Sequence, residues 1–216
     1  MTDAPDRPAP YREPQQARSA ATLARVLQAA EEIATSSGLE EMTIAGVADR
    51  AGVSVGTIYR RFKDKEQLIN ALSERMLDRR EEYVTERLRK AEPSLAGVLS
   101  AYAHALLQSF ADSAKLFPEL LRARGTKPPE RGAHTITELH RLLLEAAAPY
   151  ADEIRRSDPQ RALDTAARAL LGACFHNSVR PDPATGKAAQ YRYADELGDM
   201  AIAYLLTPDR RGTART

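Results

Sequence analysis

The side chains best suited to chemistry are gathered between residues 50 and 65, and the chemistry that they suit is phosphate binding. This segment holds one acidic residue, Asp64, and five basic residues, which are Arg50, Arg60, Arg61, Lys63 and Lys65. Its net charge is therefore +4, whereas the whole chain of 216 residues has a formal net charge of only +1. A local basic patch on a nearly neutral protein is typical of a surface that contacts nucleic-acid phosphates, and the alternative is a solvated helix face.

Two short helices joined by a tight turn are predicted to position this patch. Thr43 can cap the first helix, in which the apolar positions at the spacing of one buried face are Ile44, Val47, Ala48 and Ala51. Gly52 follows, where a helix can end in the left-handed conformation without a Cβ clash. Ser54 can then cap a second helix that runs through Phe62. This pattern predicts a helix-turn-helix, whose second helix enters the major groove of DNA.

The segment resembles the DNA-binding domain of the TetR family of transcriptional regulators. The residues that carry the resemblance are Thr43, Ile44, Val47, Ala48, Ala51 to Ser54, Gly56 to Phe62, Lys65 and Leu68. The resemblance covers the N-terminal third of the chain, and the remainder is similar only in its helical character and total length. It implies an all-α fold, with an N-terminal three-helix DNA-binding domain and a C-terminal helical domain for ligand binding and dimerisation.

On the second helix, side-chain direction separates core residues from DNA contacts. Ile58 and Phe62 lie four residues apart and are expected to point inward, which leaves the opposite face free. Ser54 and Thr57 can donate hydroxyl hydrogen bonds to phosphate. Gly56 has no side chain, so it lets the helix approach the groove closely.

Arg60 is the first candidate for a base contact, because a guanidinium can pair bidentately with guanine; a phosphate contact is the equal alternative. The family resemblance implies that Tyr59 meets the DNA backbone and that Lys65 clamps a phosphate. The full predicted set of DNA contacts is Thr43, Ser54, Val55, Gly56, Thr57, Tyr59, Arg60 and Lys65.

The chain is expected to have four parts. They are residues 1–17, a disordered N-terminal arm; 18–63, the helix-turn-helix domain; 64–207, a helical effector-binding and dimerisation domain; and 208–216, a flexible tail. The arm is rich in proline and charge and lacks apolar periodicity. Arg7, Arg12 and Arg18 could reach DNA as a basic arm, although a loose tail with incidental arginines is favoured.

Beyond residue 63, apolar residues repeat at helical spacing. A helix over about 64–92, stopped by Pro93, would be about 40 Å long and would link the DNA-binding domain to the rest, so its tilt would move the recognition helix. Ser94 and Asp158-Pro159 are candidate helix starts. Other segments are expected to be helical at about 114–124, 136–147 and 193–205, with loops at 125–132 and 180–187.

The last two helices are rich in small and apolar residues, which are expected to form a dimer interface. The predicted interface residues are Ala162, Ala166, Ala169, Ala173, Leu197, Met200, Ala201 and Tyr204. Two such helices from each of two chains would make a four-helix interface. A twofold protein reads two DNA half-sites, so we expect a homodimer on a palindromic operator. The alternative is that these alanines pack within one chain.

The helices between the predicted linking helix and the dimer helices carry residues that could line an apolar cavity with a few polar groups, the usual make-up of a small-molecule site. They are Tyr102, His104, Leu106, Phe110, Phe117, Leu121, His140, Leu143, Phe175 and His176. The family resemblance implies an effector cavity among these helices. Taken singly, each of these residues is more often ordinary core.

Little in the sequence supports catalysis, a cofactor or a metal. His134 and Glu138 are four apart and could share a helix face, but two ligands do not make a metal site. Cys174 is the single cysteine, so an intrachain disulfide is impossible, and its apolar helix favours a buried, inert thiol. No apolar run reaches membrane-spanning length and no signal peptide is apparent, so we expect a soluble cytoplasmic protein without a membrane partner.

We therefore predict a homodimeric, ligand-responsive transcriptional regulator and not an enzyme. A repressor that releases its operator on binding an unidentified, largely apolar effector is favoured. The first alternative is an activator, or a regulator controlled by a protein partner. The second, from a different class, is an all-helical enzyme or binding module whose helix-turn-helix only packs.

Overall fold

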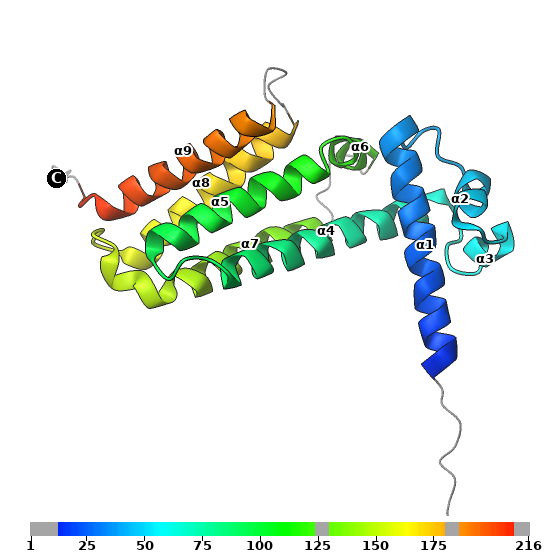
Figure 1. Cartoon of the computed structure of the whole chain (residues 1–216), viewed down its shortest axis with the longest axis horizontal. Coiled ribbons are helices and arrows are strands. Elements are labelled where there is room, and N and C mark those ends of the chain that lie inside the picture. The colour runs from blue at the N-terminus through cyan, green and yellow to red at the C-terminus, as the bar shows by residue number, and fades with distance from the viewer. Residues whose placement is uncertain (1–12, 124–129, 180–185, 210–216) are drawn as a thin grey trace, which may run out of the picture. The chain divides into compact units, whose positions relative to one another are not determined.

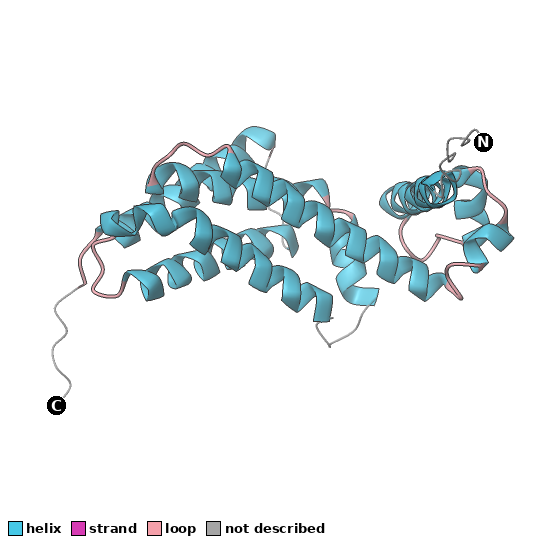
Figure 2. Ribbon diagram, turned by 90° about the horizontal axis from the view of Figure 1, so that it is seen from below, coloured by secondary structure: helices cyan, strands magenta, loops and turns pink. Residues whose placement is uncertain are grey.

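The computed structural model describes residues 13–123, 130–179 and 186–209, and in these it consists of helices and connecting loops without a strand (Figure 2). The predicted all-α class is thereby confirmed. The chain forms two compact units, the first ending at Leu72 and the second beginning at Ser73. Arg7 and Arg12, proposed as DNA-contacting arm residues, lie outside the described residues.

The first unit contains α1 (Glu13–Ser37), α2 (Ile44–Ala51), α3 (Val55–Tyr59) and the first turns of α4 (Lys65–Arg89). Its core is apolar and draws on all four helices; the most deeply buried side chains are Val26, Ala30, Ala34, Met42, Val47, Ala48, Ile58, Leu68 and Leu72. Leu68 and Leu72 explain why this unit extends into α4, beyond residue 63, where the sequence-based boundary was placed.

The start of α1 corrects the prediction of a disordered arm over residues 1–17. Residues 13–17 are helical, because Pro14 is tolerated in the first turn of a helix and the residues after it are good helix formers. Arg18, the first residue after the predicted arm, is an exposed residue on this helix.

The second unit contains the rest of α4 and the remaining helices. These are α5 (Leu95–Asp112), α6 (Leu116–Ala123), α7 (Glu130–Ala147), the 3-10 helix η1 (Ala148–Glu153), α8 (Pro159–Val179) and α9 (Lys187–Leu206). Figure 1 shows α5, α8 and α9 running side by side, and α5 also packs against α7. Since α5 is apolar around most of its circumference, it can pack against neighbours on several sides, and it supplies much of the unit's core.

Both predicted helix starts in the second unit are confirmed. The Ser94 hydroxyl accepts a hydrogen bond from the Gly97 amide at 3.0 Å, and the Asp158 carboxylate accepts one from the Arg161 amide at 3.0 Å. Each cap satisfies an amide that has no partner within its own helix.

Several helix bounds differ from the prediction. The second helix of the helix-turn-helix ends at Tyr59 instead of Phe62, because the chain tightens there: the Arg61 and Phe62 amides both donate to the Ile58 carbonyl. The first residues of the predicted 125–132 loop that are described, 130–132, belong to α7. Asp209, predicted to lie in a flexible tail, is held in place, since its carboxylate accepts hydrogen bonds from Arg156 and the Ser157 amide; residues 210–216 lie outside the described residues.

Candidate functional site

The turn between α2 and α3 is held by local hydrogen bonds at both helix ends. The Thr43 hydroxyl accepts the Gly46 amide at 3.0 Å and so caps α2. Gly52 ends α2 in the left-handed conformation, with φ of +64°, and its amide and that of Val53 donate to carbonyls of α2. The Ser54 hydroxyl caps α3 by accepting the Thr57 amide at 3.2 Å. The predicted helix-turn-helix geometry is therefore present.

The face of α3 opposite the core carries bulky side chains in solvent. Ile58 and, just after the helix, Phe62 are buried, as predicted. Val55 and Tyr59 are exposed, Tyr59 by 52%. Nothing stands over Gly56: a Cβ built there would have only the Ser54 hydroxyl near it, at 3.9 Å. This face is free to approach a large partner closely.

Hydroxyl groups hold the Arg60 side chain along this face. The Ser54 and Thr57 hydroxyl oxygens lie 2.9 Å apart, and Arg60 Nη2 donates to Thr57 Oγ1 at 3.2 Å. A guanidinium has five N–H donors, so this bond leaves most of them available. Arg60 is thus ordered beside α3 while it remains exposed, a geometry that suits either a base or a phosphate contact.

Three of the five basic residues predicted to form the patch contact other parts of the first unit. Arg50 pairs with Glu32 at 3.3 Å, Arg61 donates to the Ser19 carbonyl at 3.0 Å, and Lys65 Nζ donates to the Glu40 carbonyl at 2.9 Å. The Lys65 ammonium keeps two further donors for a phosphate. Glu32 reduces the net charge around Arg50, which sequence reasoning missed because the two residues are 18 apart in the chain and lie on different helices.

Lys65 is placed by a second cap. The Asp64 carboxylate accepts the Gln67 amide at 2.8 Å, and the Gln67 side chain accepts the Lys63 amide at 2.9 Å. This reciprocal arrangement starts α4 at Lys65 and keeps the ammonium of Lys65 beside the helix-turn-helix.

The predicted effector residues in the second unit separate into core residues, a cluster of phenylalanines and three histidines. Tyr102, Leu106 and Leu143 are fully buried core, and the Tyr102 hydroxyl donates to the Leu139 carbonyl at 3.2 Å. Burial raises the pKa of Tyr102 above its ordinary value. Phe110, Phe117 and Phe175 form a cluster of edge-to-face rings. The side chain of Leu121 lies outside the described residues.

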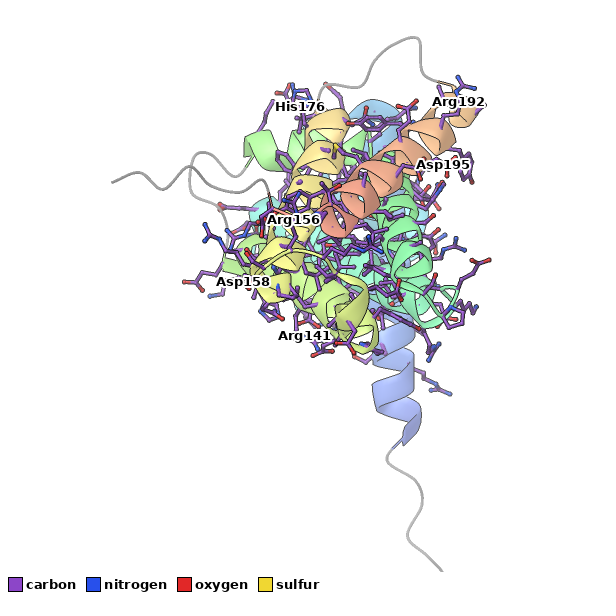
Figure 3. All side chains as sticks on the ribbon, turned by 90° about the vertical axis from the view of Figure 1, so that its left-hand side faces the viewer. Arg141, Arg156, Asp158, His176, Arg192 and Asp195 are labelled. Carbon is purple, nitrogen blue, oxygen red and sulfur yellow. The ribbon has the colours of Figure 1, made fainter. Side chains whose placement is uncertain are left out.

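The three predicted histidines are not brought together. His104 Nε2 lies 2.7 Å from Asp195 of α9, and His140 Nε2 lies 2.7 Å from Asp164 of α8. His176 is exposed near the end of α8, and Figure 3 labels it together with Asp158 at the start of that helix and Asp195 on α9. Arg168 and, more weakly, His140 hold the pKa of Asp164 below its usual value.

One groove in the second unit has a volume of about 490 Å³. It is lined by residues from the end of α4, the start of α5 and the end of α7, together with Tyr150 of η1. None of the ten predicted effector residues lines it, whereas His104 lines a much smaller hollow beside Tyr191. The groove therefore lies apart from the residues that the sequence offered as an effector site, and that prediction remains untested.

The predicted dimer residues divide between the interior and the surface. Ala162, Ala166, Leu197 and Ala201 are buried within the protomer, on helices that pack against α5 and each other. Ala169 and Met200 are exposed, and Ala173 and Tyr204 are partly so. The buried four thus serve the chain's own core, as the alternative reading of the alanines expected.

Other candidate chemistry has little support among the described residues. Cys174 is fully buried, and burial raises the pKa of its thiol to about 12. Glu138 forms an ion pair with Arg141, and within the described ranges no three His, Cys, Asp or Glu residues are grouped to hold a metal ion. No described helix is long and apolar enough to cross a bilayer.

The second helix of this helix-turn-helix carries an exposed tyrosine and a glycine whose backbone is uncovered, and an ordered arginine lies beside it. These features define the class of sequence-reading DNA-binding proteins. The family model described as "Bacterial regulatory proteins, tetR family" matches residues 26–72, which spans this whole motif. In its first unit, the chain therefore carries a domain that matches the TetR family. No curated protein sequence matches it.

Solved structures support the same fold over most of the chain. A TetR-family transcriptional regulator from Streptomyces coelicolor is 26% identical, with a TM-score of 0.58 over 88% of this chain and 100% of that one. The regulator FadR from Bacillus subtilis, in complex with stearoyl-CoA, is 16% identical, with a TM-score of 0.66 over 84% and 98%. The superantigen PfiT is 21% identical, with a TM-score of 0.64 over 83% and 95%. The last two similarities concern the fold alone.

Proposed function

We propose that the protein is a homodimeric transcriptional repressor that binds a palindromic operator and releases it when a small molecule binds the second unit. The observation that carries the DNA-binding part is the exposed face of α3, where Val55 and Tyr59 stay in solvent beside the ordered Arg60. A bacterial regulator of this kind acts on the chromosome, in the cytoplasm. We assign it no catalytic role, since its family match is to regulatory proteins.

The direct test is binding of the full-length protein to the DNA next to its own coding sequence, titrated at several salt concentrations. We expect tight binding whose affinity falls steeply with salt, because phosphate contacts release counterions. Tyr59→Ala should weaken binding to every sequence and reduce the salt slope. Tyr83→Ala is the matched control, because Tyr83 is 37% exposed on α4, in the other unit, and should leave DNA affinity unchanged. Equal effects of the two variants would contradict the proposal.

The same titration separates the two roles of Arg60. A base-reading Arg60 predicts that Arg60→Ala costs about 1–3 kcal/mol on the preferred sequence and relaxes the preference at one base pair. A phosphate contact predicts uniform weakening across sequences. Thr57→Val tests how much the hydrogen bond from Arg60 to Thr57 contributes to this ordering.

The dimer is proposed on the exposed faces of α8 and α9, where a large apolar side chain, Met200, is 51% exposed. Met200→Glu should place a charge in the interface and shift the protein toward monomer in sedimentation at micromolar concentration. Ile136→Glu is the matched control, because Ile136 is 54% exposed on α7, and this variant should remain dimeric. A wild-type protein that sediments as a monomer would rule the interface out.

The proposal that a small molecule controls DNA binding is supported by the fold of the second unit. FadR, which shares this fold, is in complex with stearoyl-CoA. An effector shifts the DNA-binding equilibrium only by its differential affinity for the two states, and a coupling of about 1–3 kcal/mol would change operator affinity roughly 5- to 150-fold. The helix α4 is the covalent route for this coupling, because it begins with Lys65 beside the helix-turn-helix and ends within the second unit.

A further inference from the structure

One arginine of the second unit lies where the helix pattern calls for an apolar residue. Along α4, residues four apart form a buried row that consists of Leu72, Met76, Arg80, Val84 and Leu88. Only Arg80 in this row is charged, and it is 5% exposed. A fully charged side chain is rarely buried this deeply unless a counter-charge accompanies it.

The contacts of Arg80 are mainly aromatic. Its guanidinium carbon lies 3.9 Å from the centroid of the Phe110 ring and 5.1 Å from that of Phe117. Nη2 donates to the Ser113 hydroxyl at 3.0 Å, whereas the buried Nε has no hydrogen-bond partner among the described residues. The ring faces stabilise the cation, but they cannot accept hydrogen bonds in the plane of the guanidinium as a carboxylate does.

The carboxylates on either side of Arg80 in the sequence are engaged elsewhere. Arg131 of α7 forms ion pairs with both Asp78 and Glu81, the latter at 2.6 Å, and it also donates to Thr135. Within the described residues, Arg80 has no ion pair with an acidic side chain. Burial without a counter-charge accordingly lowers the pKa of Arg80 to about 10.

An aromatic cluster connects this cation with the surface. The Phe110, Phe117 and Phe175 rings meet edge to face, with centroids 5.4, 6.2 and 5.8 Å apart. Phe110 and Phe117 are buried, whereas Phe175 on α8 is 40% exposed. An apolar ligand that packed against the Phe175 ring, or took its place, would contact an aromatic surface that continues as far as the Arg80 guanidinium.

We propose that Arg80 binds the carboxylate of the effector and that the Phe110, Phe117 and Phe175 rings contact the effector's hydrocarbon part. The inference rests on the proposed function, because it specifies the ligand of a regulator. A single cation among apolar rings matches a monoanion, whereas a dianionic phosphate would need further positive charge. The effector class is thus an organic monocarboxylate with an aliphatic or aromatic body.

This position also gives the ligand a route to the DNA-binding unit. Arg80 and Lys65 lie on the same continuous helix, roughly four turns apart. A carboxylate that pairs with Arg80 therefore acts directly on α4, without an intervening loop. The ligand stabilises the position of α4 in which its carboxylate and Arg80 have the better hydrogen-bond geometry.

The test uses the full-length protein with octanoate and 3-phenylpropionate as probes, and with octanamide and 3-phenylpropanamide as their neutral counterparts. Isothermal titration calorimetry and the unfolding temperature Tm report binding. We expect at least one acid to bind and to raise Tm with concentration, and its amide to bind at least about tenfold more weakly, because the charge-assisted hydrogen bonds are lost. No binding by either acid, or equal binding of acid and amide, would overturn the inference.

Two variants locate the carboxylate. Arg80→Met should remain folded, with Tm unchanged or raised, since replacing a buried charge by an apolar side chain of similar size is often neutral or stabilising. It should lose the difference between acid and amide. Arg80→Lys keeps the charge but not the two-pronged geometry, so acid binding should weaken measurably, and this variant answers the question if Arg80→Met does not fold. Retained acid binding in both variants would place the carboxylate elsewhere.

Arg156→Met is the matched control. Arg156 also stacks on an aromatic ring, at 4.0 Å from the Tyr204 centroid, but it has a carboxylate partner, Asp209, at 3.1 Å. This variant should keep the full response to the acid. Operator binding measured without any acid tests the proposed function separately: DNA binding that no carboxylate affects would overturn only this inference, while carboxylate binding without DNA binding would overturn the regulator.

Discussion

Gly97, in the first turn of α5, offers a sharp test of how the second unit is packed. A Cβ at this position would lie 2.5 Å from the Glu92 carbonyl oxygen and 2.7 Å from the Glu92 Cβ. These atoms belong to or adjoin the backbone, so they cannot move aside as the end of a flexible side chain does. Relieving the contact would also draw the Gly97 amide away from the Ser94 hydroxyl, now 3.0 Å distant.

The expected loss follows from three contributions. Weakening the Ser94 cap costs about 1 kcal/mol, and overpacking against backbone costs about 1–3 kcal/mol. The higher helix propensity of alanine returns about 1 kcal/mol. Gly97→Ala should therefore lower the free energy of unfolding by about 1–3 kcal/mol, which corresponds to a Tm lower by at least about 2 °C for a chain of this size.

Urea unfolding followed by circular dichroism, at one fixed protein concentration because a dimer is proposed, measures this change. Gly198→Ala is the control, since Gly198 is also inside a helix but its Cβ would meet the nearest atom, Ser100 Cα, at an ordinary 3.5 Å. That variant should gain up to about 1 kcal/mol. The packing argument is refuted if Gly97→Ala raises the unfolding midpoint as much as Gly198→Ala does.

Three further expectations concern other parts of the chain. Gly52→Ala forces an L side chain into a left-handed residue and should cost about 1 kcal/mol of unfolding free energy, together with DNA affinity, as measured by urea titration and DNA binding. The Cys174 thiol, its pKa raised to about 12, should react with a thiol reagent only as fast as the protein unfolds, and prompt reaction of the native protein would contradict this. Hydrogen bonds from Ser157 and Arg156 lower the pKa of Asp209 to about 2. Because the folded-state pKa is below the ordinary value of 3.8, its contribution to stability is complete above that value and is lost as the pH falls toward 2. Asp209→Asn should therefore lower Tm at neutral pH and have a vanishing effect in acid.

The sequence was sufficient where the interacting groups are close along the chain. The caps at Thr43, Ser54, Ser94 and Asp158 each join atoms three residues apart, so residue type and spacing alone predict them. The same is true of Gly52, where the end of one helix requires a left-handed residue. These features define the helix-turn-helix, which is why the DNA-binding unit could be recognised before its structure was known.

The sequence was insufficient where contacts join distant segments. Nothing near Lys65 or Arg61 indicates that Glu40 and Ser19 would receive their hydrogen bonds. Periodicity gave Ala162 and Ala166 a common face, yet it could not say whether α5 or a second chain covers that face. Arg80 was missed although a signal existed: it interrupts an otherwise apolar row of residues four apart, and only its partners show what the interruption means.

The continuity of α4 through both units has a consequence for how this protein can evolve. Domains joined by a loop tolerate insertions and can be exchanged between proteins with little regard to the junction. Here the division falls between Leu72 and Ser73, inside one helix of 25 residues whose two parts are each buried in a different core. Each inserted residue would turn one core against the other by about 100°. A new DNA-binding unit can therefore be joined here without turning the two cores only through a junction that keeps the helical register.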